Sequence, residues 1–138
     1  MSTTYQGPAL PLGFEDVRET ASADGRPSRI GVRRARAGEF VDAYPAGSHD
    51  LELAVEGRPL PEELARVARE VLAEHPRCRR VVLPVPENDL DAIAWAEDGG
   101  FRYVVDVETI SGEWSLLVTE PAWVLAQPHV LDDIPLKE

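Results

Sequence analysis

Apolar and polar residues alternate in several short segments of the chain, which is typical of strands that bury one face. In segment 50–56, Leu51, Leu53 and Val55 point to one side and Glu52 and Glu56 to the other. Segments 28–36 and 39–44 alternate in the same way between turn residues, whereas segment 14–22 is mixed. We therefore expect the first half of the chain to form an antiparallel meander.

A helical period begins at residue 61. Pro61 suits the first helical position, and the acids Glu62 and Glu63 suit the first turn. An apolar stripe then recurs at helical spacing, formed by Leu64, Val67, Ala68, Val71 and Leu72. Pro76 is expected to end this helix, because a proline removes a helical hydrogen bond.

The second half of the chain predicts three strands around a shorter helix. The apolar run 80–85 is typical of a strand covered on both faces, and Pro84 within it should lie at an edge or a bulge. Segment 87–98 predicts a helix capped by Asn88 or Asp89 and closed by the pair Gly99-Gly100. Segments 101–109 and 114–119 predict a hairpin joined by residues 110–113.

The order of these elements predicts one α/β (α+β) domain over residues 14–121, with a mixed, mostly antiparallel twisted sheet and two main helices. The strand–helix–strand unit between residues 50 and 85 predicts one parallel crossover. Residues 1–13 are expected to be an irregular lead-in. Residues 122–138 form an apolar, proline-containing tail, which we expect to dock on the domain or on a partner, including a second copy in a homodimer.

The chain has 25 acidic and 14 basic residues and a formal net charge of −11. Such a charge repels nucleic acid and anionic membranes and favours cationic or neutral partners. No apolar run approaches the length of a membrane span, and the first residues do not form a secretion signal. The single cysteine, Cys78, excludes an internal disulfide and a cysteine-built metal site. We expect a cytoplasmic protein.

Three of these segments together resemble the GNAT (Gcn5-related N-acetyltransferase) superfamily. Leu53-Ala54-Val55 is similar to the L-x-V strand of that family, and Pro86-Glu87-Asn88 is similar to its Pro-x-Asn motif. Gly100-Phe101 matches the Gly-Phe pair that ends its second helix. The resemblance covers about half of the chain.

The resemblance implies acyl transfer from acetyl-CoA or another acyl-CoA to a small-molecule or peptide amine. It implies that the strand of Leu53, Ala54 and Val55 splays from its neighbour and holds the pantetheine arm of the cofactor. The remaining implied cofactor contacts are Arg58, Asn88 and Asp89. Glu52 or Glu56 would be the general base, and a solvated strand face is the alternative interpretation of both.

The turn that would hold the cofactor's phosphates departs from the family pattern. The family has glycines there, whereas this chain has Pro59 and Pro61, which carry no N–H group, followed by Glu62 and Glu63. Ala96 stands where the family has a tyrosine that protonates the thiolate. The second hypothesis is therefore a non-catalytic GNAT-like module that binds a partner protein through the tail and two arginine clusters.

Other chemistry-bearing residues have simpler structural interpretations. Ser48-His49-Asp50 are neighbours in sequence, so they do not converge as a hydrolase triad does. The three histidines lie far apart, and we expect no metal site. Two interpretations stay open for a last group of residues, a chemical role and a role in packing or on the surface. They are Tyr44, Tyr103, Trp95, Cys78 and the arginines of segments 29–36 and 77–80.

Overall fold

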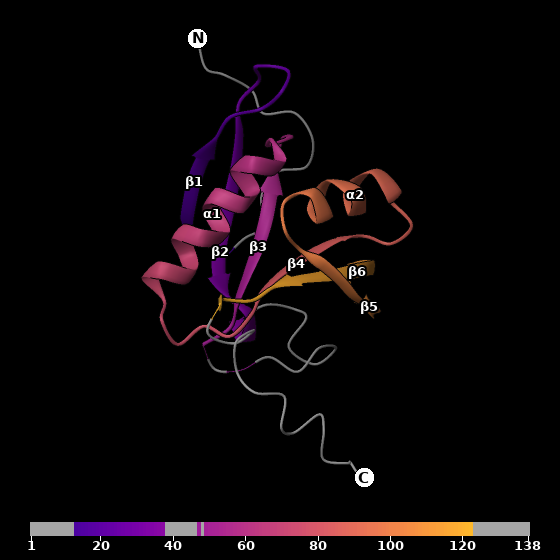
Figure 1. The fold of residues 1–138 in the computed structure, drawn as a ribbon. Coiled ribbons are helices and arrows are strands. Elements are labelled where there is room, and N and C mark those ends of the chain that lie inside the picture. The colour runs from indigo at the N-terminus through magenta and orange to yellow at the C-terminus, as the bar shows by residue number, and fades with distance from the viewer. Residues whose placement is uncertain (1–12, 38–46, 48, 123–138) are drawn as a thin grey trace.

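The computed structural model describes residues 13–37, 47 and 49–122. They form a six-stranded sheet with two α-helices packed on one of its faces (Figure 1). The strands are β1 (Asp16–Thr20), β2 (Ser28–Arg34), β3 (Leu51–Glu56), β4 (Val81–Pro86), β5 (Arg102–Thr109) and β6 (Gly112–Thr119). The helices are α1 (Pro61–Glu74) and α2 (Leu90–Asp98), and a short 3-10 turn covers Ala35–Ala37.

The strands lie in the order β1-β2-β3-β4-β6-β5. Only β3 and β4 are parallel, joined through α1, and every other neighbouring pair is antiparallel. The prediction of a mixed, mostly antiparallel sheet with two main helices is confirmed. The crossover through α1 follows from the chain itself, because a parallel pair cannot be closed by a tight turn.

Two groups of buried side chains hold the layers together. On the helix-covered face, the apolar stripe of α1, including Leu64 and Val71, packs against Leu53 of β3 and Leu83 of β4. On the opposite face, Val82, Leu116 and Val118 form a smaller buried cluster. Strand β4 therefore has buried residues on both sides, as its apolar sequence predicted.

Several boundaries differ from the sequence prediction. The mixed segment 14–22 contains the edge strand β1, and β2 ends at Arg34 where the 3-10 turn begins. The second helix begins at Leu90 rather than at residue 87, because Asn88 has a positive φ of 67° and Asp89 caps the helix. The strand expected over 39–44 lies outside the described residues.

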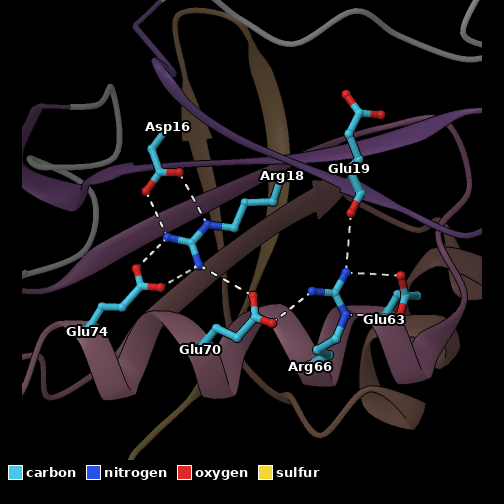
Figure 2. Close-up of polar contacts among 7 residues, drawn as sticks. All are labelled: Asp16, Arg18, Glu19, Glu63, Arg66, Glu70 and Glu74. Carbon is cyan, nitrogen blue, oxygen red and sulfur yellow. Dashed lines mark hydrogen bonds and ion pairs between the residues drawn. The ribbon is translucent and has the colours of Figure 1, made fainter.

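Two arginines attach the edge strand β1 to the flank of α1 (Figure 2). Arg18 of β1 contacts Glu74 at 2.6 Å, and Arg66 of α1 donates to the main-chain carbonyl of Glu19 at 3.2 Å. The other acids in this network are Asp16, Glu63 and Glu70. Because β1 pairs with one strand only, this network supplies its second set of contacts.

Candidate functional site

Strands β3 and β4 are paired for only two residues and then separate. Leu51 pairs with Val81 and Glu52 pairs with Val82, and the ladder ends there. Beyond this point β3 runs along α1 while β4 turns toward α2 (Figure 1). We call this separation, between residues 53–56 of β3 and residues 83–86 of β4, the fork.

The main chain of β3 faces the fork at Leu53 and Val55. The N–H of Leu51 donates to the carbonyl of Arg80 at 3.1 Å, so Leu51 directs its main-chain groups toward β4. Residues two apart in a strand direct these groups to the same edge, whereas the residue between them faces the other neighbour. Ala54 accordingly pairs with Gly31 of β2. The pair Glu52–Val82 uses the N–H of Leu53, so the main-chain groups that the sheet leaves unpaired are the carbonyl of Leu53 and both groups of Val55.

Strand β4 presents a different edge to the fork. By the same alternation Pro84 and Pro86 face β3, and a proline has no N–H to donate. The sequence predicted that Pro84 lies at an edge or a bulge. Strand β4 is interior to the sheet, and Pro84 falls where its β3-facing edge has already lost its partner. Because Pro84 has no N–H, it cannot donate to the carbonyl of Leu53, which would be the next bond of the ladder, and the pairing ends there.

The N-terminus of α1 is already engaged by the protein. The N–H of Leu60 donates to the carbonyl of Ala21 at 2.9 Å, and Ser22 bridges Pro59 in antiparallel fashion. The indole Nε1 of Trp95 on α2 donates to the carbonyl of Pro59 at 2.7 Å. The loop before α1 is therefore fixed both to the end of β1 and to α2.

The acids of the first helical turn differ in their surroundings. The carboxylate of Glu63 accepts from the N–H of Ala21 at 2.9 Å and from Arg66. The hydrogen bond from Arg66, followed by that from Ala21, lowers the pKa of Glu63. Glu62 is exposed, and so is Arg58, the only basic residue of the loop. Negative charge is thus concentrated at this helix end.

Glu52 and Glu56 lie on the sheet face opposite the helices and are 3% and 4% exposed. Glu56 contacts Arg29 at 2.7 Å and Glu52 contacts Arg33 at 3.2 Å, in each case across β2 and β3. The alternative of a solvated strand face is therefore wrong, because both carboxylates are buried against arginines. Glutamates four residues apart on one strand, opposite arginines four apart on its antiparallel neighbour, were the signal in the sequence.

Acidic side chains gather where β4 ends beside the β5–β6 hairpin. We call Glu87, Asp106, Glu108 and Glu113 the acidic rim. Desolvation raises the pKa of Glu87, and the charges of Asp106, Glu113 and Glu108 raise it further. Tyr103, which is 46% exposed, has its pKa raised by desolvation and then by its hydrogen bond to Asp106. The rim is a region of strong negative potential.

No protein-family model matches the sequence, and no curated protein matches it significantly. Solved structures do match. An uncharacterized protein from Bacillus halodurans aligns with 18% identity and a TM-score of 0.63 over 74% of this chain and 57% of its own. The aminoglycoside acetyltransferase AAC(6')-Ib in complex with coenzyme A and kanamycin aligns with 19% identity and a TM-score of 0.62 over 80% of this chain and 70% of its own. The same enzyme in complex with acetyl-CoA and paromomycin aligns with 18% identity and a TM-score of 0.63 over 84% of this chain and 71% of its own.

The chain has the GNAT fold. The order of its elements and the fork between β3 and β4 agree with this match, and the resemblance seen in the sequence is confirmed at the level of the fold. The chain spans 57% of the length of the Bacillus halodurans protein and 70% of that of AAC(6')-Ib.

At the start of α2 the GNAT-like motif has a structural role. The carboxylate of Asp89 accepts from the N–H of Ala92 at 3.0 Å and so caps the helix. Asn88 and Asp89 are both exposed at this turn. Gly100, with a φ of 94°, follows the helix end as the sequence predicted.

The other sequence candidates have structural roles where they are described. Asp50 is buried and accepts from the N–H groups of Gly47, Arg79 and Arg80, so it joins two loops rather than serving a triad. Cys78 is buried, and burial raises the pKa of its thiol to about 11. Tyr44, Ser48, His129 and the tail from residue 123 lie outside the described residues.

A groove of about 470 Å³ lies away from the fork, between the middle of α1 and the chain that follows α2. Small side chains line much of it, including Ala65, Ala68, Gly99 and Gly100. The last described residue, Ala122, lies at the same groove. Neither described α-helix is long and apolar enough to cross a membrane.

Proposed function

We propose that this chain transfers an acyl group from an acyl-CoA, such as acetyl-CoA, to an amine. The observation that carries the proposal is the fork, where the carbonyl of Leu53 and both main-chain groups of Val55 are unpaired beside β4. A cofactor arm that contains amide groups can hydrogen-bond to such an edge as an added strand does. The coenzyme A complexes of AAC(6')-Ib, which has the same fold, support this proposal.

The proposal assigns different parts of the cofactor to different residues around the fork. Leu53 and Val55 hold the pantetheine arm through their main chain, and Ala54 keeps that strand attached to β2. The bound thioester supplies an activated acyl group. Arg58 is exposed in the loop before α1, and Asn88 and Asp89 lie exposed at the start of α2.

Glu56 is the better placed of the two proposed bases. It ends β3 at the open side of the fork, whereas Glu52 lies where β3 and β4 are still paired. The contact with Arg29 fixes the Glu56 carboxylate, which must exchange that partner to accept a proton from an amine. We propose Tyr103, the one tyrosine among the described residues, as the proton donor to the departing thiolate.

The acidic rim supports a cationic amine as the acceptor. Four carboxylates at the end of β4, in a chain with a net charge of −11, attract cations and repel anions. AAC(6')-Ib, with the same fold, binds the aminoglycoside kanamycin. Polyamines, amino sugars and lysine-rich peptides are the acceptors to test first.

Calorimetric titration of the full chain with acetyl-CoA tests the proposal. We expect saturable binding at micromolar to sub-millimolar concentration, about −5 to −8 kcal/mol. With a cationic amine present, free thiol should be released at a rate that depends on both substrates. The absence of heat at millimolar acetyl-CoA would overturn the proposal.

The two glutamates form a matched pair for the chemical step. Glu56→Gln should slow acetyl transfer by about 10²-fold or more, since a general base contributes roughly that factor. Glu52→Gln should slow it much less, and both variants should bind acetyl-CoA as the parent does. Unchanged transfer in both variants would show that neither carboxylate is the base.

One observation favours the second candidate, a non-catalytic GNAT-fold module that binds a partner protein. Pro59 precedes α1, Pro61 is its first residue, and the N–H of Leu60 is bound to Ala21, so the helix end offers little to a phosphate. This candidate expects no binding of acetyl-CoA. The titration above therefore separates the two.

A further inference from the structure

The fork and the N-terminus of α1 differ in how well they suit the two parts of coenzyme A, the pantetheine arm and the nucleotide. A diphosphate at a helix N-terminus requires several free N–H groups and a favourable charge. Pantetheine requires only an unpaired strand edge and space beside it. The fork supplies the strand edge for pantetheine, whereas the N-terminus of α1 does not supply the N–H groups and charge for a diphosphate.

The N–H groups at the start of α1 are largely absent or already used. Positions 59 and 61 are prolines. The N–H of Leu60 donates to Ala21, and those of Glu63 and Leu64 donate to the carbonyl of Leu60. Of positions 59–64, only Glu62 retains an N–H without an acceptor among the described residues. A single donor does not make a phosphate cradle.

The charges around this helix end oppose an anion as well. Glu62 is exposed, and the arginine contact that lowers the pKa of Glu63 keeps that carboxylate ionised at neutral pH. Arg58 is the only basic residue between positions 57 and 65. Since Arg66 already pairs with Glu63, the exposed Glu62 offsets Arg58, and no further positive side chain among positions 57–65 compensates two phosphates.

The loop is also held in place, so it cannot open to free its amides without losing contacts. Trp95 of α2 donates to the carbonyl of Pro59, and Leu60 donates to the carbonyl of Ala21 on the other side. The hydrogen bond between Leu60 and Ala21 belongs to the antiparallel bridge between Ser22 and Pro59. These contacts come from the segment that follows β1 and from α2, and they hold the loop between them.

We propose that the chain recognises its acyl donor through the pantetheine arm alone and leaves the nucleotide in solvent. The donor class is then pantetheine thioesters in general, of which acetyl-CoA is one. This inference rests on the proposed function, because it concerns the same fork. It differs in predicting that removing the nucleotide from the donor costs almost no affinity.

Calorimetry with two donors tests it on the full chain. S-Acetylpantetheine and acetyl-CoA should bind with dissociation constants within about tenfold of each other. The affinity for acetyl-CoA should change little between low and high salt, because no phosphate is paired. Adenosine 3',5'-bisphosphate should not compete.

The contrary results are distinct. Acetyl-CoA binding more than about tenfold tighter than S-acetylpantetheine would overturn the inference and leave the proposed acyltransferase intact. Competition by adenosine 3',5'-bisphosphate would overturn it in the same way. If neither donor binds, the proposed function itself fails and the inference fails with it.

Two proline variants locate the site of binding. Val55→Pro removes an N–H that faces the fork, and Val17→Pro is its control. The pairing of β1 with β2 directs the N–H of Val17 away from the sheet, so the same chemical change occurs far from the fork. Val55→Pro should weaken both donors by tenfold or more and by equal factors, while Val17→Pro binds as the parent does. Val55→Pro that is folded by thermal denaturation yet binds normally would overturn the inference, and the donor comparison decides the matter if this variant does not fold.

Discussion

Gly57 sets the path of the chain from β3 into α1. Its φ of 85° lies in the left-handed region, and a Cβ atom there would lie 2.8 Å from the main-chain oxygen of Pro27. Gly25, in the turn between β1 and β2, has a φ of 75° but nothing within 4 Å of its Cβ position. The two glycines therefore separate the cost of backbone conformation from the cost of a clash.

We expect Gly25→Ala to lower the free energy of unfolding by about 1 kcal/mol, the cost of a left-handed alanine. Gly57→Ala should lower it by about 3 kcal/mol or more, since the clash with a backbone oxygen is added to the same cost. Urea denaturation of both variants beside the parent gives the comparison. Equal losses would show that the loop relaxes and that the clash is not real.

At the residue scale, the sequence predicted which face of the sheet a side chain lies on better than it predicted whether that side chain is buried. The alternation in segment 50–56 placed Leu53 and Glu56 on opposite faces, as observed. It could not show that Glu56 is buried, because that depends on Arg29 arriving from another strand. Burial of a charge is decided by its partner, and strand register is not visible in one segment.

At the element scale, β1 is the strand that the sequence did not reveal. Its residues are Asp16, Val17, Arg18, Glu19 and Thr20, which are mostly charged and mostly exposed. An edge strand with little buried surface has no apolar period to detect. Strands β3 and β4 and helix α1 were predicted well because each buries an apolar face. The fork was expected from the family resemblance, and Pro84 gave a local hint of it.

The contact between β1 and α1 makes a prediction about pH. The hydrogen bond from Arg18 lowers the pKa of Glu74. A lowered carboxyl pKa contributes stability above the ordinary value near 4.3, and this contribution is lost as pH falls through the lowered value. The free energy of unfolding of the parent should therefore exceed that of Glu74→Gln at pH 7, and the difference should shrink as pH falls below the ordinary value of about 4.3 and through the lowered pKa.

Glu97→Gln is the control, because Glu97 is exposed on α2 and has no ion pair among the described residues. It should show no such pH-dependent difference. Chemical denaturation between pH 3 and pH 7, repeated in 1 M salt, provides the measurement, and salt should shrink the difference at pH 7. A difference for Glu74→Gln that persists unchanged at pH 3 would mean that the ion pair is not its cause.

At the scale of the whole molecule, the groove beside α1 lies where the apolar tail begins. The described chain ends at the groove with Ala122, and the sequence continues with Trp123, Val124 and Leu125. We propose that residues 123–138 cover apolar surface on this domain or on a second copy. No sequence pattern distinguishes these two, because the groove forms only when α1 and the end of α2 come together.

Ending the chain after Ala122 should therefore lower the thermal midpoint or change the oligomeric state. Removing only Lys137 and Glu138 is the matched control and should do neither, since these two residues are charged. Differential scanning calorimetry and light scattering after size exclusion give both quantities. A truncated chain with the parent's midpoint and mass would contradict the proposal.

The prolines of β4 have a consequence beyond ligand binding. A sheet that opens in its middle exposes two internal borders, and bare strand borders invite invasion by strands from other chains. Pro84 and Pro86 make one border unable to donate, so a foreign strand meets only half of the usual ladder there. The same prolines at which the pairing of β4 with β3 ends therefore also help to keep the molecule from associating with other chains through the fork.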